Sequence, residues 1–258
     1  KPNLPVELLA MQPEDHPHYQ QVKHYYSKHA QVRQVHPNCH LIKSNAWQKF
    51  TARWGENKIY SFQTGSISAF EAEAMAEDLL EKLPRELFQE LVECHPELVR
   101  SMKEAGFLLY NSGMTLNFGR AGMRNLQTAI RMAMPMLLAR VLDVPYGINA
   151  QSFEAIEWPM DLVHRPLFED ACFVYCRDSD SAKYLQHRGI SNLNSGFRPD
   201  STFFFQNFDE VWAKEYMQSN GLEDKQFISV ILRLPDRDRD GRDPTPGATA
   251  VPGYIKQD

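Results

Sequence analysis

Three short segments place small residues and hydrogen-bond donors directly after predicted strands. They are Asn111-Ser112-Gly113, Asn149-Ala150-Gln151-Ser152 and Arg177-Asp178-Ser179-Asp180-Ser181. In open α/β sheets the ligand crevice lies outside the carboxyl ends of the strands. A helix that begins after such a segment also favours an anion at its N-terminus. The three segments therefore predict a site for an anionic ligand at one edge of a sheet.

Arg177 carries the most specific chemistry of these residues. Its guanidinium can bind a carboxylate or a phosphate through two parallel hydrogen bonds, which an ammonium group cannot do. We predict seven substrate-binding residues: Arg177, Asn111, Ser112, Gly113, Gln151, Ser152 and Ser179. Structural roles remain as alternatives for them, namely a tight turn at residues 111–113, a helix cap at Ser179 and a salt bridge from Arg177 to Asp178 or another acid.

The segments between these candidates alternate between strand and helix patterns. Strands are predicted at residues 107–110, 144–150 and 171–176, and helices at residues 126–142, 160–168 and 179–189. Apolar strands that alternate with helices are typical of a parallel sheet covered on both faces. The predicted fold class is α/β, with a Rossmann-like, doubly wound parallel sheet in which the three strands are adjacent.

Weaker patterns complete the prediction along the chain. Strands are expected at residues 6–11 and 226–232 and are possible at 59–62, while helices are expected within 16–36 and at 85–104 and 209–220. Ser68 and Glu71 form a capping box that starts a further helix, which Pro84 is expected to interrupt. We assign residues 1–224 to an N-terminal Rossmann-like domain whose first strand and loop are missing. Residues 225–258 are assigned to the truncated start of a second α/β domain.

Composition and charge exclude several classes of protein. The 258 residues carry a net charge of -5, which gives no electrostatic footprint for nucleic acid. No apolar run is long enough to span a membrane, and four scattered cysteines make no disulfide framework, so we predict a cytoplasmic protein. The most compact metal-ligand candidate is residues 36–40, and we predict no metal site.

Known catalytic motifs exclude three classes of enzyme. The sequence contains no Gly-x-Gly-x-x-Gly after a strand, no Walker A sequence and no Gly-x-Ser-x-Gly elbow. Dehydrogenases, nucleotide triphosphatases and serine hydrolases are therefore not favoured.

Longer segments resemble the polysaccharide pyruvyl transferases. The resemblance rests on the turn at residues 111–113, the segment 139–153, the segment 176–185, which begins Cys176-Arg177-Asp178-Ser179, and the segment 197–203, in that order and at the spacing of the family. It covers about half of the chain. It implies transfer of a pyruvyl group from phosphoenolpyruvate to a sugar of a cell-surface polysaccharide or glycan, with formation of a ketal across two hydroxyls.

The resemblance also sets expectations for architecture and partners. The domain would be one half of a GT-B-like, two-domain architecture, and the partners would be phosphoenolpyruvate and a glycan acceptor, with no further cofactor. The acid or base is commonly a histidine of the second domain in this family, so we assign it to none of the nine histidines here. Because one wall of the cleft would be absent, the 258-residue chain alone is expected to be inactive.

The sequence leaves two other functions open. One is a sugar-nucleotide glycosyltransferase with the same two-domain cleft, and the other is a non-catalytic carbohydrate-binding or scaffold protein. The donor that the protein uses separates the first from pyruvyl transfer. Sugar binding without turnover would indicate the second. The oligomeric state is also open, and a homo-oligomer is one possibility.

Overall fold

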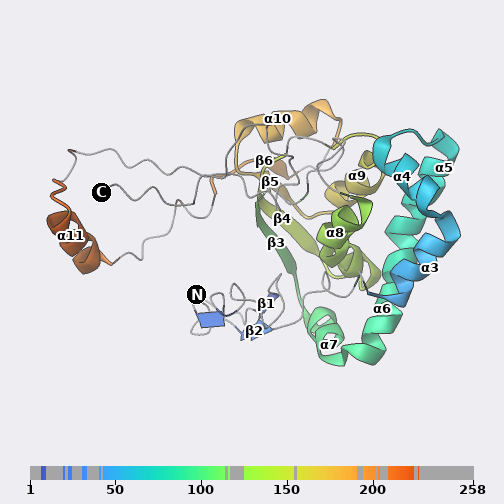
Figure 1. Cartoon of the computed structure of the whole chain (residues 1–258), viewed down its shortest axis with the longest axis horizontal. Coiled ribbons are helices and arrows are strands. Elements are labelled where there is room, and N and C mark those ends of the chain that lie inside the picture. Colours follow the sequence, from blue (N-terminus) through green and yellow to red (C-terminus); the bar gives the residue numbers. More distant parts are fainter. Residues whose placement is uncertain are drawn as a thin grey trace, which may run out of the picture. The chain divides into compact units, whose positions relative to one another are not determined.

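A parallel β-sheet of four strands organises the computed structural model (Figure 1). The structure describes residues 7–9, 20, 23–24, 31–33, 41, 43–113, 116, 125–153, 156–190, 194–200, 203, 209–223 and 226. The chain divides into two compact units, Lys1–Pro199 and Asp200–Asp258. The sheet and its surrounding helices belong to the first unit.

The strands of this sheet follow one another in space as they do in the sequence. They are β3 (Leu108–Gly113), β4 (Tyr146–Gln151), β5 (Val174–Cys176) and β6 (Ser195–Phe197), in the order β3-β4-β5-β6 and all parallel. The α/β class and the adjacency of the three predicted strands are therefore confirmed. The order runs in one direction, so the reversal that defines a doubly wound sheet does not occur among the described strands.

Helices connect successive strands and build a layer against the sheet. The connections contain α8 (Leu126–Val141), α9 (Asp161–Glu169) and α10 (Ser179–His187). A second group of helices packs on this layer: α3 (Asn45–Trp54), α4 (Glu56–Thr64), α5 (Ala69–Glu77), the π-helical turn η1 (Asp78–Lys82), α6 (Leu83–Cys94) and α7 (Pro96–Glu104). Figure 1 shows α8 between the sheet and α6, and α8 contacts both β3 and α6.

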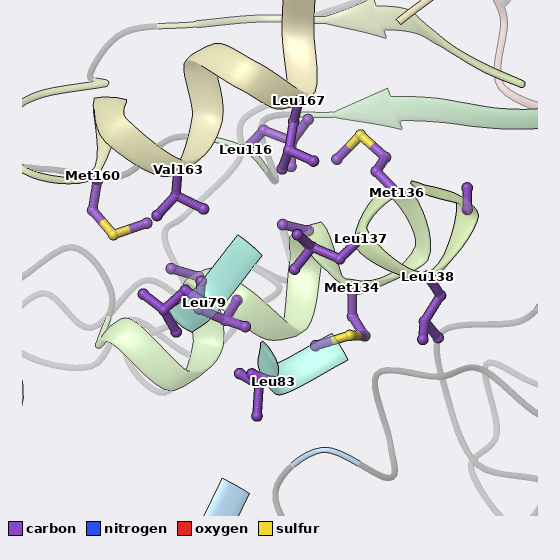
Figure 2. Packing of buried hydrophobic residues seen from close by; sticks show 14 of the residues in the cluster. Leu79, Leu83, Leu116, Met134, Met136, Leu137, Leu138, Met160, Val163 and Leu167 are labelled. Atoms are coloured by element: carbon purple, nitrogen blue, oxygen red, sulfur yellow. The ribbon is translucent and has the colours of Figure 1, made fainter. Parts of the chain in front are cut away.

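The hydrophobic core lies between these two helical groups and the inner face of the sheet. Figure 2 shows side chains of η1, α6, α8 and α9 meeting in one cluster, which includes Leu79, Leu83, Met134, Leu137 and Leu167. All five side chains are fully buried. The methionines of α8 therefore fill core space, because their flexible side chains adapt to irregular gaps.

The opposite face of the sheet carries a row of stacked aromatic rings. Phe107 stacks on Phe173 at 5.9 Å between ring centroids, and Phe173 stacks on Tyr175 at 4.8 Å. The row crosses β4 at Gly147, where an added Cβ would lie 2.4 Å from Cζ of Phe173. Gly147 is therefore the residue that allows the Phe173 ring to rest on the strand. We call Phe107, Phe173 and Tyr175 the aromatic row.

The helix boundaries follow capping residues that the sequence shows. Ser68 accepts a hydrogen bond from the Glu71 N–H at 3.4 Å and donates to its carboxylate at 2.8 Å, which confirms the capping box. Asn125 caps α8 through the Thr128 N–H at 2.8 Å. In the second unit, α11 (Glu210–Ser219) is capped by Asp209 and agrees with the predicted helix at 209–220.

Three predicted elements differ from the structure in the first unit, one of them completely and two in part. Residues 59–62 belong to α4, not to a strand, because Gly55 and Gly65 bound a helix that points Phe62 into the core. Within residues 16–36, the described residues 20, 23 and 24 are helical as predicted, but residues 31–33 form the strand β2 (Gln31–Arg33). This strand pairs in parallel with β1 (Glu7–Leu9), which lies in the predicted strand 6–11. The predicted helix 85–104 is two helices, since Pro96 starts α7.

Pro84 also behaves differently from its prediction. A proline inside a regular α-helix lacks one N–H and clashes with the carbonyl four residues earlier. Here α5, η1 and α6 follow one another without a gap, and Pro84 stands in the first turn of α6, directly after the wider π-helical turn. The proline is accommodated at that position and does not end the helix. The predicted strand at 226–232 lies outside the described residues, apart from Gln226.

Candidate functional site

An irregularity in β4 shapes the carboxyl edge of the sheet. Ile148 pairs with Val174 and Gln151 pairs with Cys176, so that three steps along β4 match two along β5. Within this bulge Ala150 is buried and has φ of 55°, a backbone conformation that costs a non-glycine residue about 1 kcal/mol or more. Bulges of this kind re-aim side chains at the ends of strands. Ser152 follows the bulge directly.

Arg177 and Ser152 meet at this edge, as predicted from their positions after β5 and β4. The Nε–H of Arg177 donates to Ser152 Oγ at 2.6 Å, and the Ser152 hydroxyl donates to Asp178 Oδ2 at 2.6 Å. The backbone N–H of Arg177 also donates to the Gln151 carbonyl at 3.0 Å. Ser152 therefore links the guanidinium to a carboxylate and fixes the orientation of the arginine.

Asp178, not Ser179, caps the helix that follows. Its Oδ1 accepts the Ser181 N–H at 2.7 Å, while Ser179 is the exposed first residue of α10. The Ser181 hydroxyl in turn accepts the Phe153 N–H at 2.8 Å, which ties the start of α10 to the segment after β4. Aspartate at this position satisfies a free helix N–H and carries a negative charge beside the positive end of the helix.

The electrostatics of Asp178 follow from these contacts. Partial burial by itself would raise the pKa of Asp178, but the hydrogen bonds from Ser152 and Ser181 and the charge of Arg177 outweigh it, and the pKa is lowered. Asp178 is therefore ionised at neutral pH. Burial and the charge of Asp178 raise the pKa of the neighbouring Cys176 to about 12, so this cysteine stays a thiol and is no nucleophile.

The remaining predicted residues lie at the same edge but differ in accessibility. Gln151 is fully buried and pairs with Gly113 across β3 and β4. Asn111 is exposed, and its side-chain oxygen accepts a hydrogen bond from Asn149 at 3.1 Å. Ser112 lies within β3, and its side chain is outside the described part of the structure. The edge thus brings together polar groups from the ends of β3, β4 and β5.

Three residues of this edge were not among the predicted site residues. Asp178 and Ser181 hold the site together, and the spacing Asp-x-x-Ser before a helix is a capping signal that could have identified them. Arg198 follows β6 at the same edge, and its N–H donates to the Cys176 carbonyl at 2.9 Å. Its place at this edge depends on the pairing of β6 with β5.

Replacing Asp178 with asparagine separates its two roles. Asparagine keeps an oxygen that accepts the Ser181 N–H, but its amide group cannot accept the Ser152 hydroxyl, so we expect a loss of about 1 kcal/mol at pH 7. The lowered pKa of Asp178 means that its ionised form stabilises the fold above about pH 4, and that this stabilisation is lost as the pH falls through the lowered value. The difference from the wild type should therefore shrink in acid.

Urea unfolding at pH 7 and at acid pH measures this effect. Asp180→Asn is the matched control, because Asp180 is exposed in the same helical turn and contacts only Lys183, at 3.8 Å, among the described residues. Equal losses for the two variants, or a difference that grows in acid, would contradict the role given to Asp178.

A cavity of about 420 Å³ lies at the other end of the sheet. Its lining includes Arg140, Tyr146 and Asp143, which precede or begin β4. Arg140 forms ion pairs with Asp170 at 3.0 Å and with Glu81 at 3.3 Å. Because these carboxylates neutralise the arginine, the cavity is less suited to an anion than the carboxyl edge.

Histidines and metal ligands add nothing to this edge among the described residues. His164 is fully buried in α9, and burial lowers its pKa to about 4, so it is neutral at physiological pH. No group of three histidine, cysteine or acidic side chains that could hold a metal ion occurs in the described part of the chain. The candidate at residues 36–40 lies outside that part.

The comparisons with known proteins agree with the resemblance seen in the sequence. No described helix has both the length and the apolar character needed to cross a membrane. No curated protein and no solved structure matches the chain. Residues 25–245, most of the chain, match the polysaccharide pyruvyl transferase family. The chain therefore belongs to this family of transferases.

Proposed function

We propose that this protein transfers a pyruvyl group from phosphoenolpyruvate to two hydroxyls of a sugar in a cell-surface polysaccharide or glycan. Membership of the family supports a pyruvyl transfer role. The observation that carries the choice of donor is the orientation of Arg177 by Ser152, at the edge of the sheet where α/β proteins bind ligands. An arginine held in this way is suited to an oxyanion of the donor.

The reaction explains why an oriented cation is needed. A proton is added to the methylene carbon of phosphoenolpyruvate, and one sugar hydroxyl attacks the cation-like C2. The bond between C2 and the phosphate oxygen then breaks, and the second hydroxyl forms a bond to C2. One hydroxyl proton replaces the proton that was added to the methylene carbon, and the other leaves with inorganic phosphate. The products are a ketal and phosphate, with no net oxidation. A guanidinium on the leaving phosphate or on the carboxylate stabilises the charge that develops there.

The start of α10 adds to this environment. Asp178 caps the helix by binding the Ser181 N–H, and Ser179 stands exposed in the first turn. Asn111, Gly113 and the buried Gln151 complete the edge on the side of β3 and β4. We propose that Ser112 and the exposed polar groups of this edge contact the donor, while Gln151 and Ser152 shape the edge from beneath.

We further propose that the sheet belongs to a Rossmann-like, doubly wound domain that forms one wall of a GT-B-like cleft. In this proposal, residues 1–224 make the first domain and residues 225–258 begin the second. A donor that is held between two walls is shielded from water, which strengthens its contacts with the arginine. The general acid and the acceptor subsite are assigned to the second wall.

Release of phosphate from phosphoenolpyruvate tests the proposed function. The full-length protein is incubated with phosphoenolpyruvate and nitrophenyl galactosides or mannosides, and phosphate and the mass of the sugar are measured. We expect phosphate release that requires both substrates and a sugar that gains one pyruvyl ketal. Release of a nucleoside diphosphate from a sugar nucleotide would instead indicate a glycosyltransferase. Sugar binding without turnover of any donor would indicate a carbohydrate-binding protein.

A further inference from the structure

Two arginines occupy equivalent positions at the ends of neighbouring strands. Cys176 of β5 is paired with Phe197 of β6, and the next residues along the two strands are Arg177 and Arg198. The Arg198 N–H donates to the Cys176 carbonyl at 2.9 Å, which continues the parallel pairing to this point. Neighbouring strands lie about 4.8 Å apart. The two arginines therefore leave the carboxyl edge of the sheet side by side.

The aromatic row supports the side chain of Arg198. The guanidinium carbon lies 5.1 Å from the centroid of the Tyr175 ring, and Nη1 donates to the Phe197 carbonyl at 3.0 Å. Tyr175 is itself stacked on Phe173. Arginine binds well to an aromatic face because its planar cation is attracted to the ring electrons. The exposed guanidinium of Arg198 is thus held on a platform beside Arg177.

Two positively charged side chains stand close together at the ends of β5 and β6. Like charges that stand on neighbouring strands repel each other, and the repulsion increases where water is excluded. Asp178 attracts Arg177 and also accepts hydrogen bonds from Ser152 and Ser181. Among the residues that the structure describes, Arg198 contacts no carboxylate and binds only a ring and a backbone carbonyl. An anion bound between the two arginines would be attracted to both and would supply the anionic partner that Arg198 lacks among these residues.

We propose that Arg198 is a second donor-binding residue and that Arg177 and Arg198 together bind a ligand with two anionic groups. The inference rests on the proposed function, because phosphoenolpyruvate carries a carboxylate and a phosphate on the same carbon atom, C2. One guanidinium binds each anionic group. A substrate with a single anionic group, such as pyruvate, can engage only one arginine fully. The pair therefore makes the site selective for a dianionic donor.

Titration calorimetry with phosphoenolpyruvate on the whole chain tests this proposal. We expect Arg198→Ala to raise the Kd for phosphoenolpyruvate about tenfold or more, as expected for loss of a charge-assisted hydrogen bond, and to affect pyruvate binding much less. Tyr175→Leu, which removes the platform but keeps the charge, should raise the Kd by a smaller factor, whereas Tyr175→Phe should leave it unchanged. Arg100→Ala is the matched control, because Arg100 is an exposed arginine of α7 that pairs with Glu97 on its own helix.

The possible outcomes separate this inference from the proposed function. If the wild type binds phosphoenolpyruvate and Arg177→Lys weakens binding while Arg198→Ala does not, Arg198 is no donor-binding residue and the proposed function stands. If the wild type does not bind phosphoenolpyruvate at all, both are overturned. If Arg198→Ala unfolds the protein, Arg198→Lys decides: it keeps the charge but loses the planar contacts, and unchanged affinity in this variant would overturn the inference.

Discussion

Replacing Arg177 with lysine is expected to lower kcat/KM for phosphoenolpyruvate about ten- to a hundredfold, which corresponds to the loss of one charge-assisted hydrogen bond in the transition state. Lysine keeps the positive charge. It has no Nε–H for Ser152 Oγ and no planar group that can bind two oxygens of an anion. Steady-state kinetics of the full-length protein, with phosphate release as the signal, measure the effect, and Arg177→Ala should show at least as large a loss.

Two further variants identify the cause of this loss. Ser152→Ala keeps the arginine but removes its hydrogen-bond partner, so it should lower kcat/KM by a smaller factor than Arg177→Lys. Arg100→Lys changes an exposed arginine of α7 and should leave kcat/KM unchanged. A sharp fall in Tm of Arg177→Ala with kcat/KM intact would show that Arg177 is a structural residue and that the donor binds elsewhere.

Gly147→Ala is expected to destabilise the fold by about 1 to 3 kcal/mol, the usual range for overfilling a packed site. The added Cβ would lie 2.4 to 2.7 Å from three atoms of the Phe173 ring. The ring cannot simply turn aside, because it is stacked between Phe107 and Tyr175 and its own carbonyl accepts the Ile148 N–H at 2.9 Å. Urea denaturation followed by circular dichroism gives the free energy of unfolding.

Gly106→Ala provides the control for this substitution. An added Cβ at Gly106 meets no atom within 4 Å, so the variant should be as stable as the wild type or slightly more stable. Phe173→Leu in combination with Gly147→Ala should recover part of the loss, because leucine is smaller than the ring that it replaces. Equal stability of the two alanine variants would show that Phe173 does not rest on β4 in solution.

The sequence predicted the central elements of the fold because their signals are local. Each of these elements is indicated by a pattern within its own segment. The apolar runs at residues 107–110 and 171–176 correspond to β3 and β5, and the apolar helix after Asn125 corresponds to α8. Residues 59–62 show the opposite case. Their apolar pattern fits a strand, but glycines at 55 and 65 set the bounds of a helix, and Phe62 of this helix belongs to the buried core cluster.

The sequence predicted those residues of the candidate site that directly follow a recognisable strand. The meeting of Ser152 with Arg177 follows from β4 lying beside β5, and both residues were expected at that edge. The bulge at Ala150 could not be read from the sequence, because its alanine side chain gives no sign of a positive φ. Arg198 was also missed, since its role depends on pairing between β5 and β6 and on a ring that lies on a different strand.

The π-helical turn at Asp78–Lys82 indicates where members of the family can gain or lose a single residue. Leu79 lies in this turn and Leu83 and Leu87 follow at intervals of four residues, yet all three are fully buried. A regular α-helix has 3.6 residues per turn, so repeated steps of four would rotate such a stripe away from the core. The π-helical turn is wider than an α-helical turn, so it accommodates one extra residue. Its geometry is that of an α-helix into which a single residue has been inserted. Natural insertions or deletions of one residue between α5 and α6 should therefore concentrate at this turn. A length change there leaves the buried faces of α5 and α6 directed toward the core.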